Sequence, residues 1–499
     1  MIAKINSAIP YGYSGRLVSV EGDSSRGLPS FNIVGMASRT VSESRDRVRS
    51  ALTNSGFTFP DDKLTINLAP AELDKTGTHL DLSIALAVLV LSGQLLARDL
   101  SDALFVGELS LDGDLRPVRG IINVVETASS AGFDTVYLPR ANYPQASLVD
   151  HIKIIPVSSL RELFLHLKGQ KLITKSAVKN TETEEKLPIS PLLDHIIGQT
   201  LAKRALTIAI AGHHNILLSG PPGAGKTLLA KAAANLLPPL TKEEQISSTK
   251  LYSLTGVTDQ IISTRPFRSP HHTASSSSII GGGTFALPGE ISLATNGILF
   301  LDELPEFHRD VLEALRQPLE DRQISISRAK SKTTYPADFM LIATMNPCPC
   351  GYYGDPDHEC TCSPPEIKRY QKKLSGPLFD RIDMNVNVKK VKSSALLAHK
   401  SAETAIEHTA VKNTITEAID LQLSRFGKFN STLSSHEVVQ SIDLSPAAKK
   451  LLSSASDSLN LSARAYFKTI KVARTIADLE NSSTVSEQHI AEALTFRRR

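Results

Sequence analysis

The chain has 499 residues, too many for one hydrophobic core, and its length predicts roughly two to four domains. Its hydrophobic content of 41% and charged content of 21% are ordinary for globular proteins and exclude a mainly disordered chain. The formal net charge of +4 is small for this length, so total charge gives no argument for or against a nucleic-acid partner.

The sequence lacks the marks of secretion and of membrane insertion. Pro10 and Gly12 interrupt the N-terminal segment, which has no apolar core of a signal peptide. The most apolar segment, 80–91, contains Asp81 and is too short to cross a bilayer, so it predicts a buried helix. All four cysteines lie within 348–362, which argues against a disulfide framework and favours the cytoplasm.

Residues 1–167 predict a mixed α/β domain. Short β-type runs such as 64–68 and 135–138 surround the helical segment 80–91. The next residues, 168–191, are rich in Lys, Thr, Glu, Ser and Pro without apolar periodicity, which is typical of an exposed linker.

Residues 192–392 predict an α/β domain with a parallel sheet. The apolar strand 216–219 runs into a glycine-rich turn and a helix at 228–236, and further strands are expected at 298–301 and 339–344. Residues 393–499 predict a helical domain. Its helices are expected at 405–426, 445–458, 462–479 and 486–496.

A phosphate-binding loop follows the strand 216–219. The loop comprises Gly220, Pro221, Pro222, Gly223, Ala224, Gly225, Lys226 and Thr227. The glycines let successive backbone N–H groups turn toward phosphates, and the following helix adds its positive N-terminal end. Lys226 supplies a mobile cation and Thr227 is suited to ligate magnesium, so the loop predicts a site for ATP and magnesium.

Acidic and amide side chains follow two other strands. Asp302 and Glu303 come directly after 298–301, where Asp302 is expected to orient magnesium and Glu303 to polarise the attacking water. Asn346 ends a further apolar strand and either positions water beside the γ-phosphate or is a turn residue before a proline. Arg381 is a candidate arginine finger for the nucleotide of the next subunit.

Several longer segments resemble a known family. They are Arg265–Thr273, Gly281–Thr284, Pro288–Ala294, Leu299–Phe307 and Lys471–Leu479. Over essentially its whole length the chain is similar to the ComM/YifB family, a magnesium-chelatase-like group of AAA+ ATPases that includes bacterial DNA helicases. The resemblance implies a hexameric ring that hydrolyses ATP between subunits and moves DNA. It also implies branch migration when single-stranded DNA is integrated during natural transformation, with Arg381 as the trans-acting finger and Arg464 as the second sensor arginine.

The N-terminal unit resembles the Lon protease domain in the segments 106–120 and 133–139. The nucleophile region, 75–82, has no serine in the expected context, and Ile122 stands where the catalytic lysine is expected. Because a Ser/Lys dyad needs both partners, we expect a non-proteolytic scaffold for ring assembly or for DNA.

Two basic segments are candidates for DNA contact. Arg328, Lys330 and Lys332 lie at the expected tip of a hairpin, a position that faces the pore in related ring helicases. Their phosphate contacts would be independent of sequence; the alternative is an ordinary solvated hairpin. The second candidate comprises Arg265, Arg268, His271 and His272.

His271 and His272 follow these arginines, and a serine run with Gly281 to Gly283 comes behind them. The segment is suited to a flexible loop that senses the nucleotide state; binding of metal by the two histidines is the alternative.

The cysteines form two Cys-x-Cys pairs, which are Cys348 with Cys350 and Cys360 with Cys362. Four soft ligands suit a tetrahedral zinc site of structural role, and His358 is able to replace one sulfur. The one-residue spacing within each pair leaves incidental free thiols as the alternative.

The leading hypothesis is an ATP-dependent DNA helicase or translocase. The alternative is an ATP-driven remodelling or chelatase-type subunit that acts on a protein partner without DNA, and a tetrapyrrole metal chelatase is weakened by the Lon-like extension. Likeness of fold alone does not choose among these functions. ATP hydrolysis that is stimulated by DNA and depends on the basic hairpin would distinguish the helicase or translocase from the subunit that acts on a protein partner.

Overall fold

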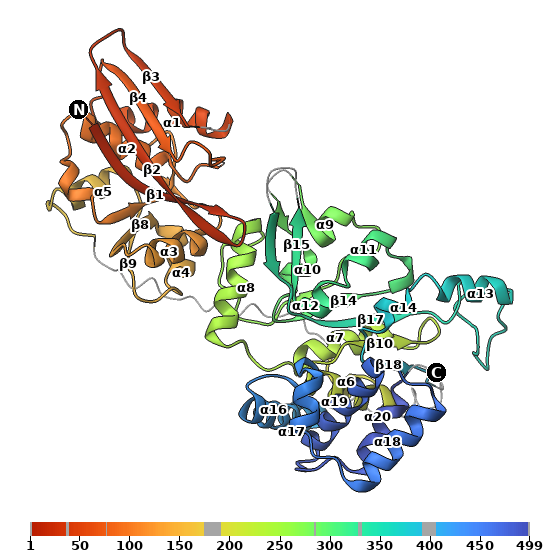
Figure 1. The fold of residues 1–499 in the computed structure, drawn as a ribbon. Helices are drawn as coiled ribbons and strands as arrows, with labels where there is room; N and C mark the ends of the chain where they lie inside the picture. Colours follow the sequence, from red (N-terminus) through yellow and green to blue (C-terminus); the bar gives the residue numbers. More distant parts are fainter. Residues whose placement is uncertain are drawn as a thin grey trace.

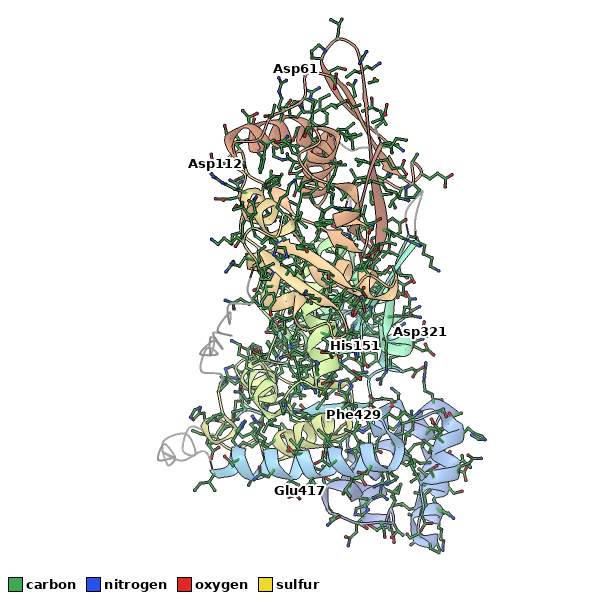
Figure 2. The ribbon with its side chains drawn as sticks, turned by 90° about the vertical axis from the view of Figure 1, so that its left-hand side faces the viewer. Asp61, Asp112, His151, Asp321, Glu417 and Phe429 are labelled. Carbon is green, nitrogen blue, oxygen red and sulfur yellow. The ribbon has the colours of Figure 1, made fainter. Side chains whose placement is uncertain are left out.

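The computed structural model of the protein describes residues 2–35, 39–75, 77–173, 191–283, 286–327, 332–391 and 406–497. Figure 1 shows three successive parts, namely an N-terminal sheet with helices, a central sheet with helices, and a C-terminal group of helices. In the view turned by 90° the molecule is elongated, with Asp61 near one end and Glu417 near the other (Figure 2). The predicted α/β fold with a parallel sheet and a helical C-terminal region is confirmed.

The N-terminal part is built on a seven-stranded sheet in the order β3-β4-β2-β1-β5-β8-β9. Its strands are β1 (Ile2–Tyr11), β2 (Ser14–Ser25), β3 (Ser30–Val34), β4 (Lys63–Ala69), β5 (Ala103–Phe105), β8 (Thr135–Pro139) and β9 (Lys153–Val157). The pairs β1–β2 and β2–β4 are antiparallel, and the other neighbours are parallel. A separate ribbon pairs β6 (Glu108–Leu109) with β7 (Leu115–Arg116).

Five α-helices accompany this sheet. They are α1 (Arg39–Asn54), α2 (Asp81–Leu91), α3 (Ile121–Ser130), α4 (Tyr143–Ala146) and α5 (Leu160–Leu167). Every residue of α2 is buried, because its sequence is apolar on all sides, and the predicted buried helix is thereby confirmed.

The central part contains a five-stranded sheet in the order β11-β14-β17-β10-β18, in which all neighbours are parallel. Its strands are β10 (Ile216–Ser219), β11 (Phe267–Arg268), β14 (Ile298–Leu301), β17 (Met340–Met345) and β18 (Met384–Asn387). Ser219 is paired with Met345, and Leu301 with Ala343, so the carboxyl ends of β10, β14 and β17 meet at one edge. The segments that follow these three strands therefore form one site.

Nine α-helices surround the central sheet within the described ranges. They are α6 (Thr200–Gly212), α7 (Lys226–Leu236), α8 (Lys242–Thr255), α9 (Ser276–Ile280), α10 (Glu290–Leu293), α11 (Arg309–Ala314), α12 (Pro318–Asp321), α13 (Pro364–Gln371) and α14 (Gly376–Phe379). Two ribbons project from this part, β12 (Gly281–Gly282) with β13 (Leu287–Pro288) and the hairpin β15 (Gln323–Ser327) with β16 (Lys332–Pro336).

The C-terminal part is helical. Its helices are α16 (Ile406–Phe426), α17 (Ser435–Ser441), α18 (Pro446–Ser458), α19 (Ala463–Leu479) and α20 (Glu487–Thr495). The side chains of Ser445, Ser462 and Ser486 cap the helices that follow them, which explains why the expected starts agree with the structure within two residues. Buried side chains of α16, α18, α19 and α20 share one core with α6, α7 and the central sheet.

The predicted linker, 168–191, and the start of the predicted helical domain, 393–405, lie largely outside the described residues. Among the described helices, none combines the length and the apolar character that a membrane crossing requires.

Candidate nucleotide site and its surroundings

The glycine-rich loop is shaped by close backbone packing. A Cβ atom on Gly220 would lie 2.1 Å from the carbonyl oxygen of Val388, so no other residue fits there. Gly223 and Gly225 have φ values of +74° and +87°, which residues with a side chain rarely adopt. Strand β10 therefore turns sharply into α7, whose first residues are Lys226 and Thr227.

Lys226 folds back over this loop. Its Nζ donates to the carbonyl oxygens of Gly220 at 2.6 Å and Pro221 at 3.0 Å, and to Oδ1 of Asn346 at 3.1 Å. Burial lowers the pKa of the Lys226 ammonium, while the charges of Asp302 and Glu303 oppose this effect. Asn346 thus lies within hydrogen-bond distance of the loop lysine and does more than end a strand.

Asp302 lies beside Thr227. The Thr227 hydroxyl donates to Oδ2 of Asp302 at 3.2 Å, and the Thr344 hydroxyl donates to Oδ1 at 2.5 Å. A hydroxyl and a carboxylate are hard oxygen donors of the kind that Mg²⁺ prefers, so the residues present fit a magnesium ion. Sequence reasoning missed Thr344, which lies within the buried strand β17 two residues before Asn346.

Glu303 is held in an unusual backbone conformation. Its φ of +54° is in the left-handed region, which is uncommon for a residue with a side chain. The Glu303 N–H donates to the Thr344 hydroxyl at 2.9 Å. Thr344 therefore positions both acidic residues, a role that no motif in the sequence predicted.

Gln199, also missed from the sequence, fastens the loop from outside. Its Nε2 donates to the carbonyl oxygens of Ala224 at 2.9 Å and Lys389 at 2.6 Å. The glutamine thereby joins the phosphate loop to the segment that follows β18.

Arg381 and Arg464 lie away from this site and close to each other. Nη2 of Arg464 donates to Oε1 of Glu320 at 2.6 Å, and Nη2 of Arg381 donates to Oε2 of the same carboxylate. The Arg381 carbonyl accepts from the side chain of Asn215, the residue before β10. Because the phosphate loop follows β10, the two arginines lie at the opposite edge of the sheet.

The four cysteines form one cluster. Their sulfur atoms all lie within 4.8 Å of one another, and the distances from Cys348 to Cys350 and to Cys360 are 3.3 and 3.7 Å. Sulfurs at about 2.3 Å from a tetrahedral zinc ion would be about 3.8 Å apart, so the cluster has the dimensions of a metal site. The backbone N–H of Tyr353 donates to the sulfur of Cys348, as suits a thiolate ligand.

The cysteine segment packs directly on the phosphate loop. A Cβ atom on Gly351 would lie 2.7 Å from Cδ of Pro222. On its other side, the Gln371 side chain donates to the carbonyl oxygen of Pro347 at 3.1 Å. The cysteine segment therefore contacts the phosphate loop through Gly351 and contacts α13 through Pro347.

Arg265 and Arg268 are engaged inside the protein. Arg265 pairs with Glu244 at 2.8 Å and donates to the carbonyl oxygens of Pro238 and Asn296. Arg268 pairs with Glu290 at 2.5 Å. Each of these two arginines, which were expected to contact DNA, is thus paired with a carboxylate of its own chain.

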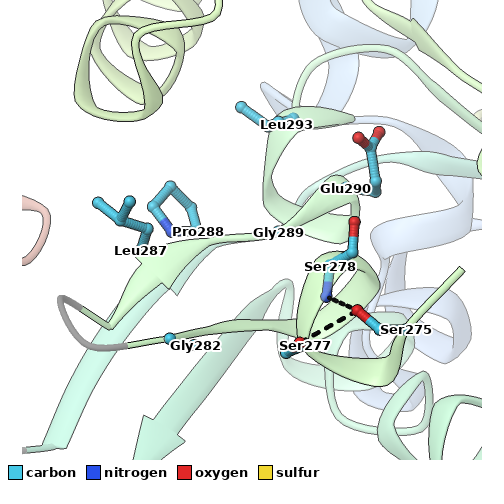
Figure 3. Close-up of a pocket in the computed structure, with 10 residues that line it drawn as sticks. Ser275, Ser277, Ser278, Gly282, Leu287, Pro288, Gly289, Glu290 and Leu293 are labelled. Atoms are coloured by element: carbon cyan, nitrogen blue, oxygen red, sulfur yellow. Dashed lines mark hydrogen bonds between the residues drawn. The ribbon is translucent and has the colours of Figure 1, made fainter.

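A shallow cavity of about 300 Å³ lies beside Glu290 (Figure 3). It is lined by Ser275, Ser277, Ser278, Gly282, Gly283, Leu287, Pro288, Gly289, Glu290 and Leu293. Glu290, which is paired with Arg268, is the one charged residue of this lining. His271 and His272 stack at 4.2 Å between ring centroids, and within the described residues they belong to no cluster of metal-ligating side chains.

The expected basic hairpin exists as β15 and β16, and Lys332 is exposed at the start of β16. Arg328 and Lys330 lie outside the described residues.

Among the residues that the structure describes, Ser83 and Lys75 of the region that resembles a protease nucleophile site have separate partners. The Ser83 hydroxyl donates to the carbonyl oxygen of Phe105 at 2.7 Å, whereas Nζ of Lys75 donates to those of Gly35 and Pro70. Ile122 is fully buried in α3.

Comparison with known proteins places this sequence in a family. The family described as magnesium chelatase, subunit ChlI, matches residues 192–396, and two further descriptions of the same subunit match residues 20–142 and 406–497. The competence protein ComM of Haemophilus influenzae is 42% identical over 99% of this chain and 97% of its own length. The chain belongs to the ComM/YifB family of magnesium-chelatase-like proteins. YifB of Escherichia coli is 40% identical, over 99% of this chain and 96% of its own length.

Two partial similarities extend beyond this family. Lon protease 2 of Bacillus subtilis is 26% identical over 31% of this chain, and the mouse DNA helicase MCM8 is 28% identical over 34% of it. The chain thus shares sequence with a protease and a DNA helicase outside its family, and membership of the magnesium-chelatase-like family suggests an ATPase.

Proposed function

We propose that this protein is an ATPase that drives movement along DNA and promotes branch migration when single-stranded DNA is integrated during natural transformation or recombination. The observation that carries the proposal is the convergence of Lys226, Thr227, Asp302 and Asn346 at the carboxyl ends of neighbouring strands. The name of the competence protein ComM supports the biological setting, and the similarity to a DNA helicase supports the motor.

The residues of the loop and of the two neighbouring strand ends have different roles in ATP hydrolysis. The backbone N–H groups of 223–227 bind the phosphates, and Lys226 exchanges its carbonyl partners for phosphate oxygens. Thr227 and Asp302 hold magnesium, which supplies positive charge to the phosphates when bound. Glu303 accepts a proton from the attacking water, and Asn346 orients that water.

The two distant arginines support a ring. Arg381 and Arg464 lie at the sheet edge opposite to the loop of their own subunit, so the nucleotide that they serve belongs to a neighbour. A hexamer that hydrolyses ATP between subunits follows as the proposed assembly, with Arg381 as finger and Arg464 as sensor.

DNA contact is assigned to the hairpin. Arg328, Lys330 and Lys332 would bind phosphates without sequence preference, and binding would weaken as salt rises. We assign zinc to Cys348, Cys350, Cys360 and Cys362, as a structural ion that closes the loop between β17 and α13.

The test is ATP hydrolysis with and without single-stranded or branched DNA, together with a branch-migration assay. Wild-type protein is expected to hydrolyse ATP faster with DNA, and Glu303→Gln to lose hydrolysis while still binding ATP. Replacement of Arg328, Lys330 and Lys332 by alanine is expected to abolish the stimulation by DNA and to leave basal hydrolysis.

The matched control replaces three exposed lysines elsewhere, Lys171, Lys449 and Lys450, with the same change in charge. It should keep the stimulation by DNA. Hydrolysis by the wild type that is indifferent to every DNA would instead favour the alternative, a remodelling or chelatase-type subunit that acts on a protein partner.

A further inference from the structure

One carboxylate joins the two arginines that lie far from the phosphate loop. Glu320 accepts hydrogen bonds from Arg381 through one oxygen and from Arg464 through the other. Arg381 follows α14, and Arg464 is the second residue of α19, so Glu320 connects the central part of the protein to the C-terminal helices.

The charges of this group do not balance. One carboxylate faces two guanidinium groups, which leaves one positive charge uncompensated within the trio. Nη1 of Arg381 donates to the carbonyl oxygen of Pro377 at 2.8 Å, but its buried Nε has no hydrogen-bond partner among the described residues. The trio therefore carries a net positive charge, which favours a second anion.

Two members of the group are accessible, whereas the Arg381 side chain is 15% exposed. The side chains of Glu320 and Arg464 are 45% and 41% exposed. Ion pairs with this much exposure are weak, because water screens them and long side chains lose freedom when they are held. A phosphate, which offers more charge and more oxygen atoms than a carboxylate, would compete well for the same guanidinium groups.

Glu320 lies at the root of the basic hairpin. It belongs to α12, which ends at Asp321, and β15 begins at Gln323. The side chain of Gln317, the residue before α12, accepts from the backbone N–H of Ser325 at 3.3 Å, so α12 and β15 are joined by more than the chain. A displacement of Glu320 would be passed on to the hairpin.

We propose that Glu320 is a positioning residue that holds Arg381 and Arg464 in the isolated subunit and releases them to the nucleotide phosphates of a neighbouring subunit. Release frees α12 and changes the position of the hairpin, so occupancy of the neighbouring ATP site is linked to the grip on DNA. The inference rests on the proposed function and adds to it the residue that connects the two sites.

The first experiment compares Glu320→Gln with Asp321→Asn in the full-length protein. Both changes remove one negative charge from α12, but Asp321 is exposed and contacts neither arginine (Figure 2 labels it). Glu320→Gln is expected to raise ATP hydrolysis without DNA several-fold and to bring the ratio of DNA-stimulated to basal hydrolysis toward one. Asp321→Asn should keep the wild-type ratio, and an unchanged ratio in Glu320→Gln would overturn the inference.

A double variant tests whether the effect passes through the arginines. Adding Arg464→Gln to Glu320→Gln should cancel the gain in basal hydrolysis, whereas a general loosening of the fold would leave that gain in place. Thermal unfolding of each variant identifies any that fails to fold.

A second readout does not need DNA or hydrolysis. In a Glu303→Gln background, ATP-dependent assembly is measured by analytical ultracentrifugation, and Glu320→Gln should shift assembly to lower protein concentration several-fold. If DNA fails to stimulate the wild type but this shift occurs, the motor function is wrong and the release of the arginines stands. If stimulation is normal and assembly is unchanged, the role of Glu320 is wrong.

Discussion

Thr344 shows how much of the candidate site depends on one buried hydroxyl. It donates to Asp302 and accepts from the backbone N–H of Glu303, whose φ of +54° needs such support. The side chain points from strand β17, between the strand of the acidic pair and the strand of the phosphate loop. The position of the two carboxylates is therefore set from the neighbouring strand.

Thr344→Val keeps the shape of this side chain and removes both hydrogen bonds. Because a partly buried N–H and a carboxylate oxygen lose their partner, we expect the free energy of unfolding to fall by about 1–3 kcal/mol. We also expect a larger fall in kcat than rise in KM for ATP, since Glu303 acts on water and not on substrate binding. Steady-state kinetics and thermal unfolding measure both effects. Thr344→Ser, which keeps the hydroxyl, is the control, and equal kcat values in the two variants would contradict this role.

At the scale of single residues, motif spacing predicted the loop and the acidic pair, because their chemistry needs fixed residue types after buried strands. Thr344, Gln199 and Glu320 could not be found in this way. Each acts through a partner that is distant in the sequence, and only the fold brings the two together.

The loop between β17 and α13 is an element without regular structure that touches the phosphate loop at Pro222. Cys348 lies two residues after Asn346, and Gly351 packs on Pro222. An ion held by the four sulfurs would therefore stiffen the segment that begins at Asn346. It would also stiffen the packing of Gly351 on Pro222.

We expect protein purified without added metal to contain about one zinc ion per chain, as measured by mass spectrometry of the metal content. Replacing Cys360 and Cys362 by serine should remove the ion and weaken ATP binding by roughly tenfold, the effect expected when support around a site is lost. His358→Ala is the matched control. His358 lies in the same loop, stacked on Tyr352, and is not among the clustered sulfur ligands, so zinc and ATP affinity should persist. Native protein with only trace zinc would refute the assignment.

Among the elements, long helices with strong patterns were predicted well. The expected segments 405–426 and 462–479 correspond to α16 and α19, and the Ser462 side chain caps the start of α19. The short α17 and the two-residue strands β6, β7, β12 and β13 were not predicted. Such short elements form because neighbouring segments hold them, and their own residues carry little pattern.

At the scale of the whole molecule, the N-terminal part packs against α8. Lys250 of α8 pairs with Glu126 of α3 and lies 4.2 Å from the ring centroid of Tyr13, whose hydroxyl bonds to that of Ser247. The turn between β1 and β2 also reaches the basic hairpin, since a Cβ atom on Gly12 would lie 2.6 Å from Cγ2 of Thr333. Because the N-terminal part contacts the base of the hairpin, we propose that it influences DNA binding by the hairpin.

Gly12→Ala tests this contact. The substitution adds a methyl group against Thr333, so we expect loss of stability and reduced stimulation of ATP hydrolysis by DNA. Gly56→Ala is the control, because Gly56 also has a positive φ but has no atom within 4 Å of the added group, and it should cost only roughly 1–2 kcal/mol of backbone strain. Adding Thr333→Ser removes the opposing methyl group and should restore part of the stimulation. No recovery in the double variant would show that the contact does not act on the hairpin.

The parallel central sheet has one further consequence for symmetry. Because the phosphate loop and the Arg381–Arg464 pair lie at opposite edges of the sheet, each subunit presents two unlike surfaces. If the two arginines act on a neighbour's ATP as proposed, two subunits related by a twofold axis would bring like surfaces together and leave both ATP sites without arginines. Completed sites would then require a head-to-tail contact, which repeats until it closes on itself or continues as a filament.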